Sequence, residues 1–310
     1  MMLVMDGIIF FFNYLFLILM VLVSISFLTL LERKILGIVQ DRKGPNKVSV
    51  GGIIQPMGDG VKLLSKEVMW IYKSNFYYYF FSPCMSFIIM LLCWLIYPYL
   101  YSYLNSNLDF LLILMVLSLG VYGIMLAGWS ANSMYSMFGS IRAISQTISY
   151  EVTLVFLMVY QFFFSCSVSF KKLMEFQNGF MFMFYLFIVF LMVFIVMLAE
   201  LNRTPFDLVE GESELVSGFN VEYISSTFAL IFLAEYGMIL FMGMMFMIMY
   251  FGCSSLGWVG LILFVYLIIL LRGVLPRVRY DSLMFMGWKS VLPVSMNLLI
   301  IYLCLLVLCW

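Results

Sequence analysis

The sequence predicts an all-α fold: a polytopic integral membrane protein with about eight transmembrane helices and one short interfacial amphipathic helix. Of the 310 residues, 65% are hydrophobic and only 10% are charged, and the mean hydropathy is +1.11. Phe, Met and Tyr are abundant, with 32, 27 and 20 copies. Apolar runs of about 20 residues recur along the chain, and each is long enough to cross a bilayer as a helix.

Eight apolar runs are expected to span the membrane. They occupy roughly 8–31, 76–97, 110–129, 144–165, 180–199, 227–250, 258–271 and 290–309. Each is expected to be helical, because lipid offers no partner to a free backbone amide or carbonyl. Between them we find no repeat, low-complexity tract or domain linker, so residues 1–310 are expected to form a single integral-membrane domain.

The basic residues predict how the chain is oriented. With eight spans, the loops 32–75, 130–143, 200–226 and 272–289 share one face and hold 14 of the 16 Lys and Arg residues. The opposite face holds only Lys171 and Lys172. Basic loops stay on the inner side of a membrane. Both termini are therefore expected on the outer side, and the loop 200–226 on the inner side.

A short helix is predicted within the first basic connection, which is expected to run from Glu32 to about Asn75. Between Met57 and Val68, apolar residues recur at spacings of three and four, with charged residues on the other faces. This pattern suits a helix lying in the plane of the membrane interface. An ordinary connecting helix would show the same pattern, and the sequence does not separate the two.

The stretch from Ala199 to Tyr223, AELNRTPFDLVEGESELVSGFNVEY, is the most informative part of the chain. Six of the 16 acidic residues gather here between two apolar runs: Glu200, Asp207, Glu210, Glu212, Glu214 and Glu222. Carboxylates beside a bilayer are costly unless they are solvated, paired or protonated part of the time. The pattern favours proton or cation handling. The alternative is a solvated loop whose acids cap helices.

Within this loop, Glu200, Arg203 and Asp207 would share one face if the fifth helix continued through them. Pro205 argues against a continuous helix, so we expect their pairing to form across a break. Acids four residues apart further along the loop repel each other unless one of them is protonated.

Two acids lie inside expected spans. Glu151 stands about seven residues into the fourth span, and Glu235 about eight residues into the sixth. At 1.5 Å per residue both would be roughly 10–12 Å deep, where acids usually face the bundle interior or a water-filled cavity. We expect Tyr150 and Gln146 to polarise Glu151, and Arg142 to anchor the same helix at the interface. The alternative is a polar clasp between helices.

Several classes of function are excluded by missing motifs. The chain has no histidine, and its six cysteines form no C-x-x-C pair, so it is expected to bind no haem, iron–sulfur cluster or typical zinc ion. It also lacks G-x-G-x-x-G and G-x-x-x-x-G-K-[ST], the motifs of dinucleotide and ATP sites. With a net charge of zero, the chain offers nothing to nucleic acid. Electrons or chemical energy are therefore expected to come from a partner.

Five segments together resemble subunit 1 of respiratory complex I, the NADH:ubiquinone oxidoreductase. They are ERKILGIVQDRKGPNKV, RAISQTISYEVTL, AELNRTPFDLVEGESELVSGFNVEY, FALIFLAEY and LPRVRYD. The resemblance runs from about Leu22 to Trp288, and that family also has eight spans. It implies a membrane subunit of the proton-translocating enzyme, which forms much of the ubiquinone-binding tunnel and the acidic path that couples quinone reduction to proton pumping.

The resemblance assigns two groups of residues. The quinone tunnel and the interface with the peripheral arm would comprise Glu32, Arg33, Arg42, Lys43, Asp59, Lys62, Arg142, Arg203 and Arg279. The proton path and coupling loop would comprise Glu151, Glu200, Asp207, Glu210, Glu212, Glu214, Glu222 and Glu235. No residue of this chain is expected to be catalytic in isolation, and no metal site is expected.

The resemblance also implies a substrate, partners and a location. Ubiquinone would be the substrate, bound at the interface with partner subunits, while NADH, FMN and the iron–sulfur clusters would belong to those partners alone. The partners would be the quinone-module subunits of the peripheral arm, neighbouring membrane-arm subunits and membrane lipid. Length and residue bias resemble the mitochondrially encoded form. This implies the mitochondrial inner membrane, with both termini toward the intermembrane space and the acidic loop toward the matrix.

Two functions of other classes stay open from the residues alone. A stand-alone cation or proton transporter would be supported by inverted repeats or paired broken helices, and the sequence shows neither. An inert anchor for a peripheral arm would leave Glu151 and Glu235 unexplained.

Overall fold

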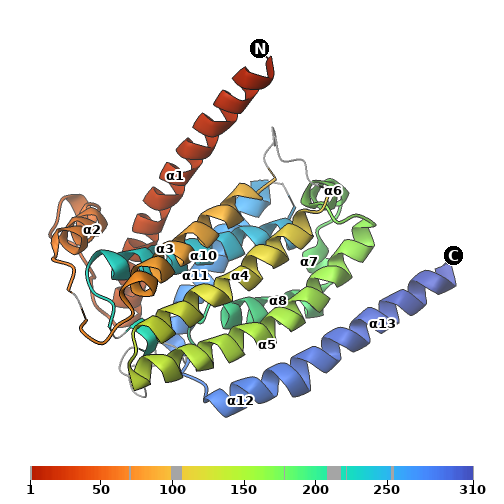
Figure 1. The fold of residues 1–310 in the computed structure, drawn as a ribbon. Coiled ribbons are helices and arrows are strands. Elements are labelled where there is room, and N and C mark those ends of the chain that lie inside the picture. Colours follow the sequence, from red (N-terminus) through yellow and green to blue (C-terminus); the bar gives the residue numbers. More distant parts are fainter. Residues whose placement is uncertain are drawn as a thin grey trace.

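The computed structural model describes residues 2–69, 71–98, 107–177, 179–207, 218–220, 222–252 and 255–309. Every regular element within these ranges is a helix (Figure 1). The longer helices are α1 (Met2–Val39), α3 (Phe76–Leu95), α4 (Asp109–Ser130), α5 (Met134–Ser165), α8 (Phe187–Glu200), α10 (Ser226–Tyr250), α11 (Ser255–Val274) and α13 (Leu292–Cys309). The shorter elements are α2 (Gln55–Ser65), α6 (Phe170–Phe176), α7 (Phe182–Tyr185), α12 (Tyr280–Phe285), the 3-10 helices η1 (Val50–Gly52) and η2 (Gly218–Asn220), and the π-helix η3 (Met286–Val291).

The bundle is built around α10, in which every residue from Phe241 to Tyr250 is buried. Helices α1, α3 and α11 pack against it, α4 packs against α3 and α5, and α5 contacts α8 and α13. In Figure 1 the first half of α1 extends beyond the bundle, and α13 runs along one side of it. Within the described residues, seven helices are long and apolar enough to cross a membrane, and α8 is a shorter apolar helix. The predicted fold class is confirmed.

Several helices extend beyond the apolar runs that predicted them. Helix α1 continues to Val39 rather than ending near residue 31, and α5 begins at Met134 rather than near 144. The expected loops at these points are therefore partly helical. Hydropathy marks where apolar side chains stop, whereas a helix continues until a cap or a breaking residue ends it.

The fifth expected span, 180–199, is divided into two helices. Helix α7 ends at Tyr185 and α8 begins at Phe187, because Leu186 between them has non-helical backbone angles (φ −112°, ψ 38°). Helix α8 has 14 residues and is therefore about 21 Å long, less than the ~30 Å of a bilayer core. No Pro or Gly occurs between residues 181 and 200, so the sequence carried no signal for this break.

The short helix predicted between Met57 and Val68 is α2, which starts and ends slightly earlier. Pro56 stands in its first turn, where proline's fixed φ and missing N–H are tolerated. None of its residues is buried, and its apolar side chains Val61 and Leu64 are more than two-thirds exposed. An exposed apolar stripe suits a helix lying on a membrane surface.

A close approach of α4 to α5 depends on one glycine. A Cβ at Gly128 would lie 2.1 Å from the Oγ of Ser140 and 2.3 Å from its Cβ. Such small residues let helices pack closely within a membrane. Gly120 lies on the same helix, yet a Cβ there would meet no heavy atom within 4 Å.

Gly128→Ala is therefore expected to destabilise the protein, while Gly120→Ala is not. Alanine is the better helix former at both positions, but at Gly128 overpacking costs roughly 1–3 kcal/mol. The measurement is the thermal unfolding midpoint of each variant in detergent or lipid. Equal midpoints for the two variants would show that α4 and α5 do not depend on this contact.

Candidate functional site: an acidic cavity beside a buried ion pair

A cavity of about 140 Å³ lies between α3, α4, α5 and α10, next to the end of α8. Two acids, Glu200 and Glu235, line it together with Arg203 and with mainly apolar side chains of α3, α4 and α10. The volume is enough for several water molecules, since one needs about 10–15 Å³ by this measure. We call this space the acidic cavity. It brings together two predicted proton-path residues from different helices.

Glu200 is the last residue of α8. Its Oε2 atom is buried and has no hydrogen-bond partner among the described residues. Helix α8 packs on α5, where Glu151 lies close enough to interact electrostatically with Glu200. Neighbouring carboxylates in water-poor surroundings repel each other, and a proton on one of them relieves that repulsion. Glu151 and Glu200 are therefore two acids close enough to affect each other's ionisation.

The turn that follows α8 is fixed by one side chain of α5. Gln146 donates hydrogen bonds through Nε2 to the carbonyl oxygens of Ala199 (2.9 Å) and Phe206 (3.0 Å). These two carbonyls stand on either side of the turn, and α8 ends before Pro205 as predicted. Gln146 thereby orients the backbone from which the acidic cavity receives its acid and its arginine.

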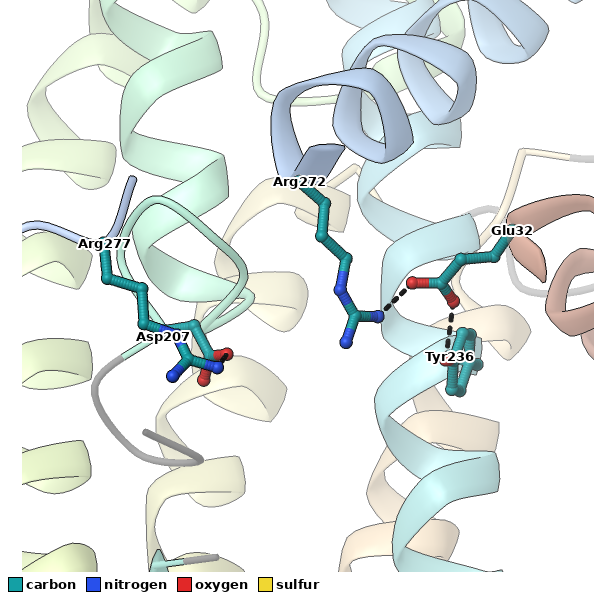
Figure 2. A network of polar contacts seen from close by, with 5 residues as sticks. All are labelled: Glu32, Asp207, Tyr236, Arg272 and Arg277. Carbon is teal, nitrogen blue, oxygen red and sulfur yellow. Dashed lines mark hydrogen bonds and ion pairs between the residues drawn. The ribbon is translucent and has the colours of Figure 1, made fainter. Parts of the chain in front are cut away.

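A second support for this turn comes from the segment between α11 and α12. The amide of Val278 donates to the carbonyl of Pro205 at 2.9 Å, and Arg277 forms an ion pair with Asp207 at 3.4 Å (Figure 2). Asp207 is only 4% exposed. Its pairing with Arg277 was not predicted, because we expected Asp207 to pair within its own loop.

A separate polar cluster joins α1, α10 and α11. Glu32 of α1 forms an ion pair with Arg272 of α11, and its Oε2 accepts a hydrogen bond from the hydroxyl of Tyr236 at 2.6 Å. Figure 2 shows both partners reaching the same carboxylate, away from the Arg277–Asp207 pair. We call Glu32, Tyr236 and Arg272 the Glu32 cluster. Beside it lies a gap of about 10 Å³, which Arg203 also lines.

The other residues predicted for the tunnel mouth lie near the surface. Arg33 forms an ion pair with Asp59 of α2, and Asp59 also accepts a hydrogen bond from Gln55 at 3.0 Å. These contacts fasten α2 to the end of α1. The remaining basic residues here are exposed: Arg42, Lys43 and Lys62. Their charges are available to a partner.

Two tyrosines, Tyr79 and Tyr223, connect the backbone at Glu222 to residues that line the acidic cavity. Tyr223 is buried and stacks on Tyr79 of α3, with 4.5 Å between ring centroids. Its hydroxyl lies 2.9 Å from the Oγ of Ser82 and 3.2 Å from the carbonyl of Ala127, both of which line the cavity. Burial raises the pKa of the Tyr223 hydroxyl, so it stays a hydrogen-bond donor. Tyr79 in turn donates to the carbonyl of Glu222 at 2.7 Å.

The environment predicted for Glu151 is wrong in one respect. Tyr150 donates its hydroxyl to the carbonyl of Leu283 at 2.8 Å, and the Nε2 of Gln146 is used on the turn after α8. Neither donor is therefore left to polarise Glu151. Adjacent residues point about 100° apart around a helix, so Tyr150 and Glu151 face different neighbours.

The last predicted residues have mixed surroundings. Arg279 forms an ion pair with Asp281 at 2.9 Å, and both side chains are largely exposed. Arg142 is partly buried on α5. Glu210, Glu212 and Glu214 lie outside the described residues. Within the described ranges, no three His, Cys, Asp or Glu side chains gather closely enough to hold a metal ion.

Three residues of these clusters were not predicted: Tyr236, Arg272 and Arg277. Tyr236 follows Glu235 directly in the sequence. A tyrosine next to an acid within an apolar run is a pattern that could have indicated a polar contact. In the sequence, the two arginines do not differ from other basic residues beside the spans. Their partners are 240 and 70 residues away along the chain, and no local sequence pattern predicts pairs so far apart.

Comparison with known proteins gives a consistent picture. Residues 12–303 match the model of a family described as NADH dehydrogenase. The chain is 48% identical over 291 residues to "NADH-ubiquinone oxidoreductase chain 1" of Aedes aegypti, covering 93% of each chain. It is also 48% identical over 300 residues to the protein of that name from Anopheles gambiae, covering 96% of each. The same name belongs to a Patiria pectinifera protein, 41% identical over 313 residues, covering 97% of this chain and 96% of that one.

Proposed function

The chain belongs to the NADH dehydrogenase family of NADH-ubiquinone oxidoreductase chain 1 proteins, and from this premise we propose that it forms much of the ubiquinone tunnel and the acidic path that couples quinone reduction to proton pumping. As a member of this family it is a multi-pass membrane subunit of the oxidoreductase complex. NADH, FMN and the iron–sulfur clusters are assigned to partner subunits, and ubiquinone is the substrate.

The observation that carries the proposal is the shared cavity of Glu200 and Glu235. Acids within a membrane protein are costly and normally serve a proton or ion path. Here they come from separate helices and face the same space, and Glu200 also interacts electrostatically with Glu151. A helix–helix clasp would need no cavity of this size. A route for protons needs groups that titrate and room for water between them.

The tunnel side of the proposal rests on the Glu32 cluster and the exposed basic residues around α2. The gap beside Glu32 and Arg272, about 10 Å³, is far too small for a quinone ring. A tunnel at this place therefore needs a second wall, which a partner subunit of the peripheral arm would supply. Reducing a quinone consumes two electrons and two protons. The electrons would come from that partner, while this chain would supply apolar lining and fixed charges.

The proposed orientation follows from the distribution of basic residues. The face with 14 of the 16 Lys and Arg residues would lie toward the matrix side of the mitochondrial inner membrane. The coupling loop with Asp207, Glu210, Glu212 and Glu214 would lie on that side, as would Glu222 of the proton path. Both termini would lie toward the intermembrane space, and neighbouring membrane-arm subunits would continue the acidic path.

Charge reversal at the tunnel mouth tests the proposed position in the complex. Arg33→Glu or Arg42→Glu is expected to weaken either attachment of the peripheral arm or access of quinone, because both residues are exposed. Arg42 is available to a partner, and Arg33 holds α2 through Asp59. In complex that stays assembled, NADH oxidation by a soluble artificial acceptor should persist while ubiquinone reduction falls. The measurement is the ratio of these two rates in purified complex.

Lys171→Glu provides the matched control, since Lys171 is exposed and would lie on the opposite, charge-poor face. Its ratio of rates should equal that of the unaltered complex. A parallel loss of both activities in assembled Arg33→Glu complex would contradict the placement of this face at the quinone end.

A further inference from the structure

Arg203 occupies a position that no other described residue shares. It lines both the acidic cavity and the small gap beside the Glu32 cluster. It is only 8% exposed, so its charge is held within the protein. The two spaces otherwise have entirely different linings within the described ranges. The guanidinium therefore stands at the partition between the predicted proton path and the predicted tunnel wall.

Arg203 packs on a ring that also belongs to the Glu32 cluster. Its Cζ lies 4.6 Å from the centroid of the Tyr236 ring, a distance at which a cation is attracted to the ring face. The hydroxyl of the same ring donates to Glu32, and the residue before it, Glu235, lines the acidic cavity. Two consecutive residues of α10, Glu235 and Tyr236, thus face the acidic cavity and the Glu32 cluster respectively.

The charged groups around Arg203 come from four elements. They are Glu200 at the end of α8, Glu235 on α10, Glu32 on α1, and Arg272 on α11. Arg272 already pairs with Glu32 and repels Arg203. The positive charge of Arg203 is therefore pulled toward the tunnel side by Glu32, pushed away by Arg272, and attracted toward the cavity by its acids. A change in any of these charges alters the balance.

We propose that Arg203 is a positioning residue that couples the Glu32 cluster to the acidic cavity: its guanidinium moves toward the acids when the negative charge of Glu32 is reduced, and away from them when it is restored. This inference rests on the proposed function, because it assumes that the acidic cavity carries protons. Arginine suits the task, since its planar group stacks on a ring and keeps its charge at all working pH values. Lysine would keep the charge without the stacking.

The test uses the pH dependence of ubiquinone reduction by the whole complex. A positive charge beside carboxylates favours their ionised form, so its removal has the opposite effect. At low pH, protonation of the cavity acids is expected to lower activity, and we call this part of the pH profile the acid limb. Arg203→Gln is therefore expected to move the acid limb to higher pH, by about one unit or more. Arg203→Lys should keep the limb near its original position. A lower rate with an unmoved limb in Arg203→Gln would make Arg203 purely structural and overturn the inference.

Glu32→Gln is the second part of the test. It can be measured even if the Arg203→Gln variant fails to fold or assemble. Removing the negative charge releases Arg203 toward the cavity, so the acid limb should move to lower pH. This movement should disappear in the double variant Glu32→Gln/Arg203→Gln, which has no guanidinium to move. An unmoved limb in Glu32→Gln, or the same movement with and without Arg203, would contradict the coupling.

Failure of the inference differs from failure of the proposed function. If Glu200→Gln complex translocates protons normally, the cavity is not on the proton path and the proposed function itself is wrong. If Glu200→Gln abolishes translocation while the Arg203 and Glu32 variants leave the acid limb unmoved, the proton path stands and only the role of Arg203 falls.

Discussion

Replacing Glu200 with glutamine is expected to lower ubiquinone reduction by more than about tenfold, within the range that proton-transfer groups contribute. Glutamine keeps the shape of the side chain but cannot carry a proton to or from the cavity. The measurement is NADH:ubiquinone turnover in purified complex whose subunit complement has been verified.

Glu175→Gln is the matched control, since Glu175 is an exposed acid on α6 away from the cavity. It makes the same chemical change, and its turnover should match that of the unaltered complex. Oxidation of NADH by a soluble acceptor should be unchanged in both variants. Normal ubiquinone turnover in Glu200→Gln would mean that this acid is a structural group.

Arg272→Gln is expected to destabilise attachment of α1 to α10 and α11. Glu32 is 7% exposed, and the substitution leaves its charge with Tyr236 as the partner described in the structure. Breaking a buried pair from one side costs roughly 3–5 kcal/mol. We expect about 1–3 kcal/mol here, because the Arg272 side chain is 36% exposed and water screens the pair. The measurement is the temperature at which the complex loses this subunit on native gels.

The double variant Glu32→Gln/Arg272→Gln tests whether an unpaired charge causes that loss. Removing both charges is often close to neutral, so the double variant should be more stable than Arg272→Gln alone. A double variant that loses the subunit at a lower temperature than the single variant would show that packing, rather than charge, holds these helices together.

Most of the fold could be predicted from the sequence because membrane helices obey a simple rule. An apolar run of about 20 residues can satisfy its backbone in lipid only as a helix, and α3, α4 and α10 closely match their expected runs. The rule says nothing about where a helix continues into water, so the extension of α1 to Val39 and the early start of α5 were missed. The break at Leu186 involves neither proline nor glycine and depends on tertiary packing.

The candidate site was predictable in its acids but not in its partners. An acid among apolar residues is conspicuous, so Glu200 and Glu235 were singled out without a structure. Their convergence on one cavity depends on how α8 packs near α10, and no local pattern encodes that. The pairing of Glu32 with Arg272 joins the first helix to the seventh apolar run. Sequence spacing could not distinguish Arg272 from any other basic residue beside a span.

The proton-to-electron ratio of Glu235→Gln complex in sealed vesicles tests the central claim most directly. Glu235 lines the acidic cavity, and glutamine removes its titratable proton while keeping its size. With the full subunit complement confirmed, the variant is expected to lose ubiquinone-linked turnover, or to turn over with fewer protons translocated per electron than the unaltered complex. Normal turnover with a normal proton-to-electron ratio would contradict the claim and make this carboxyl group a clasp between helices.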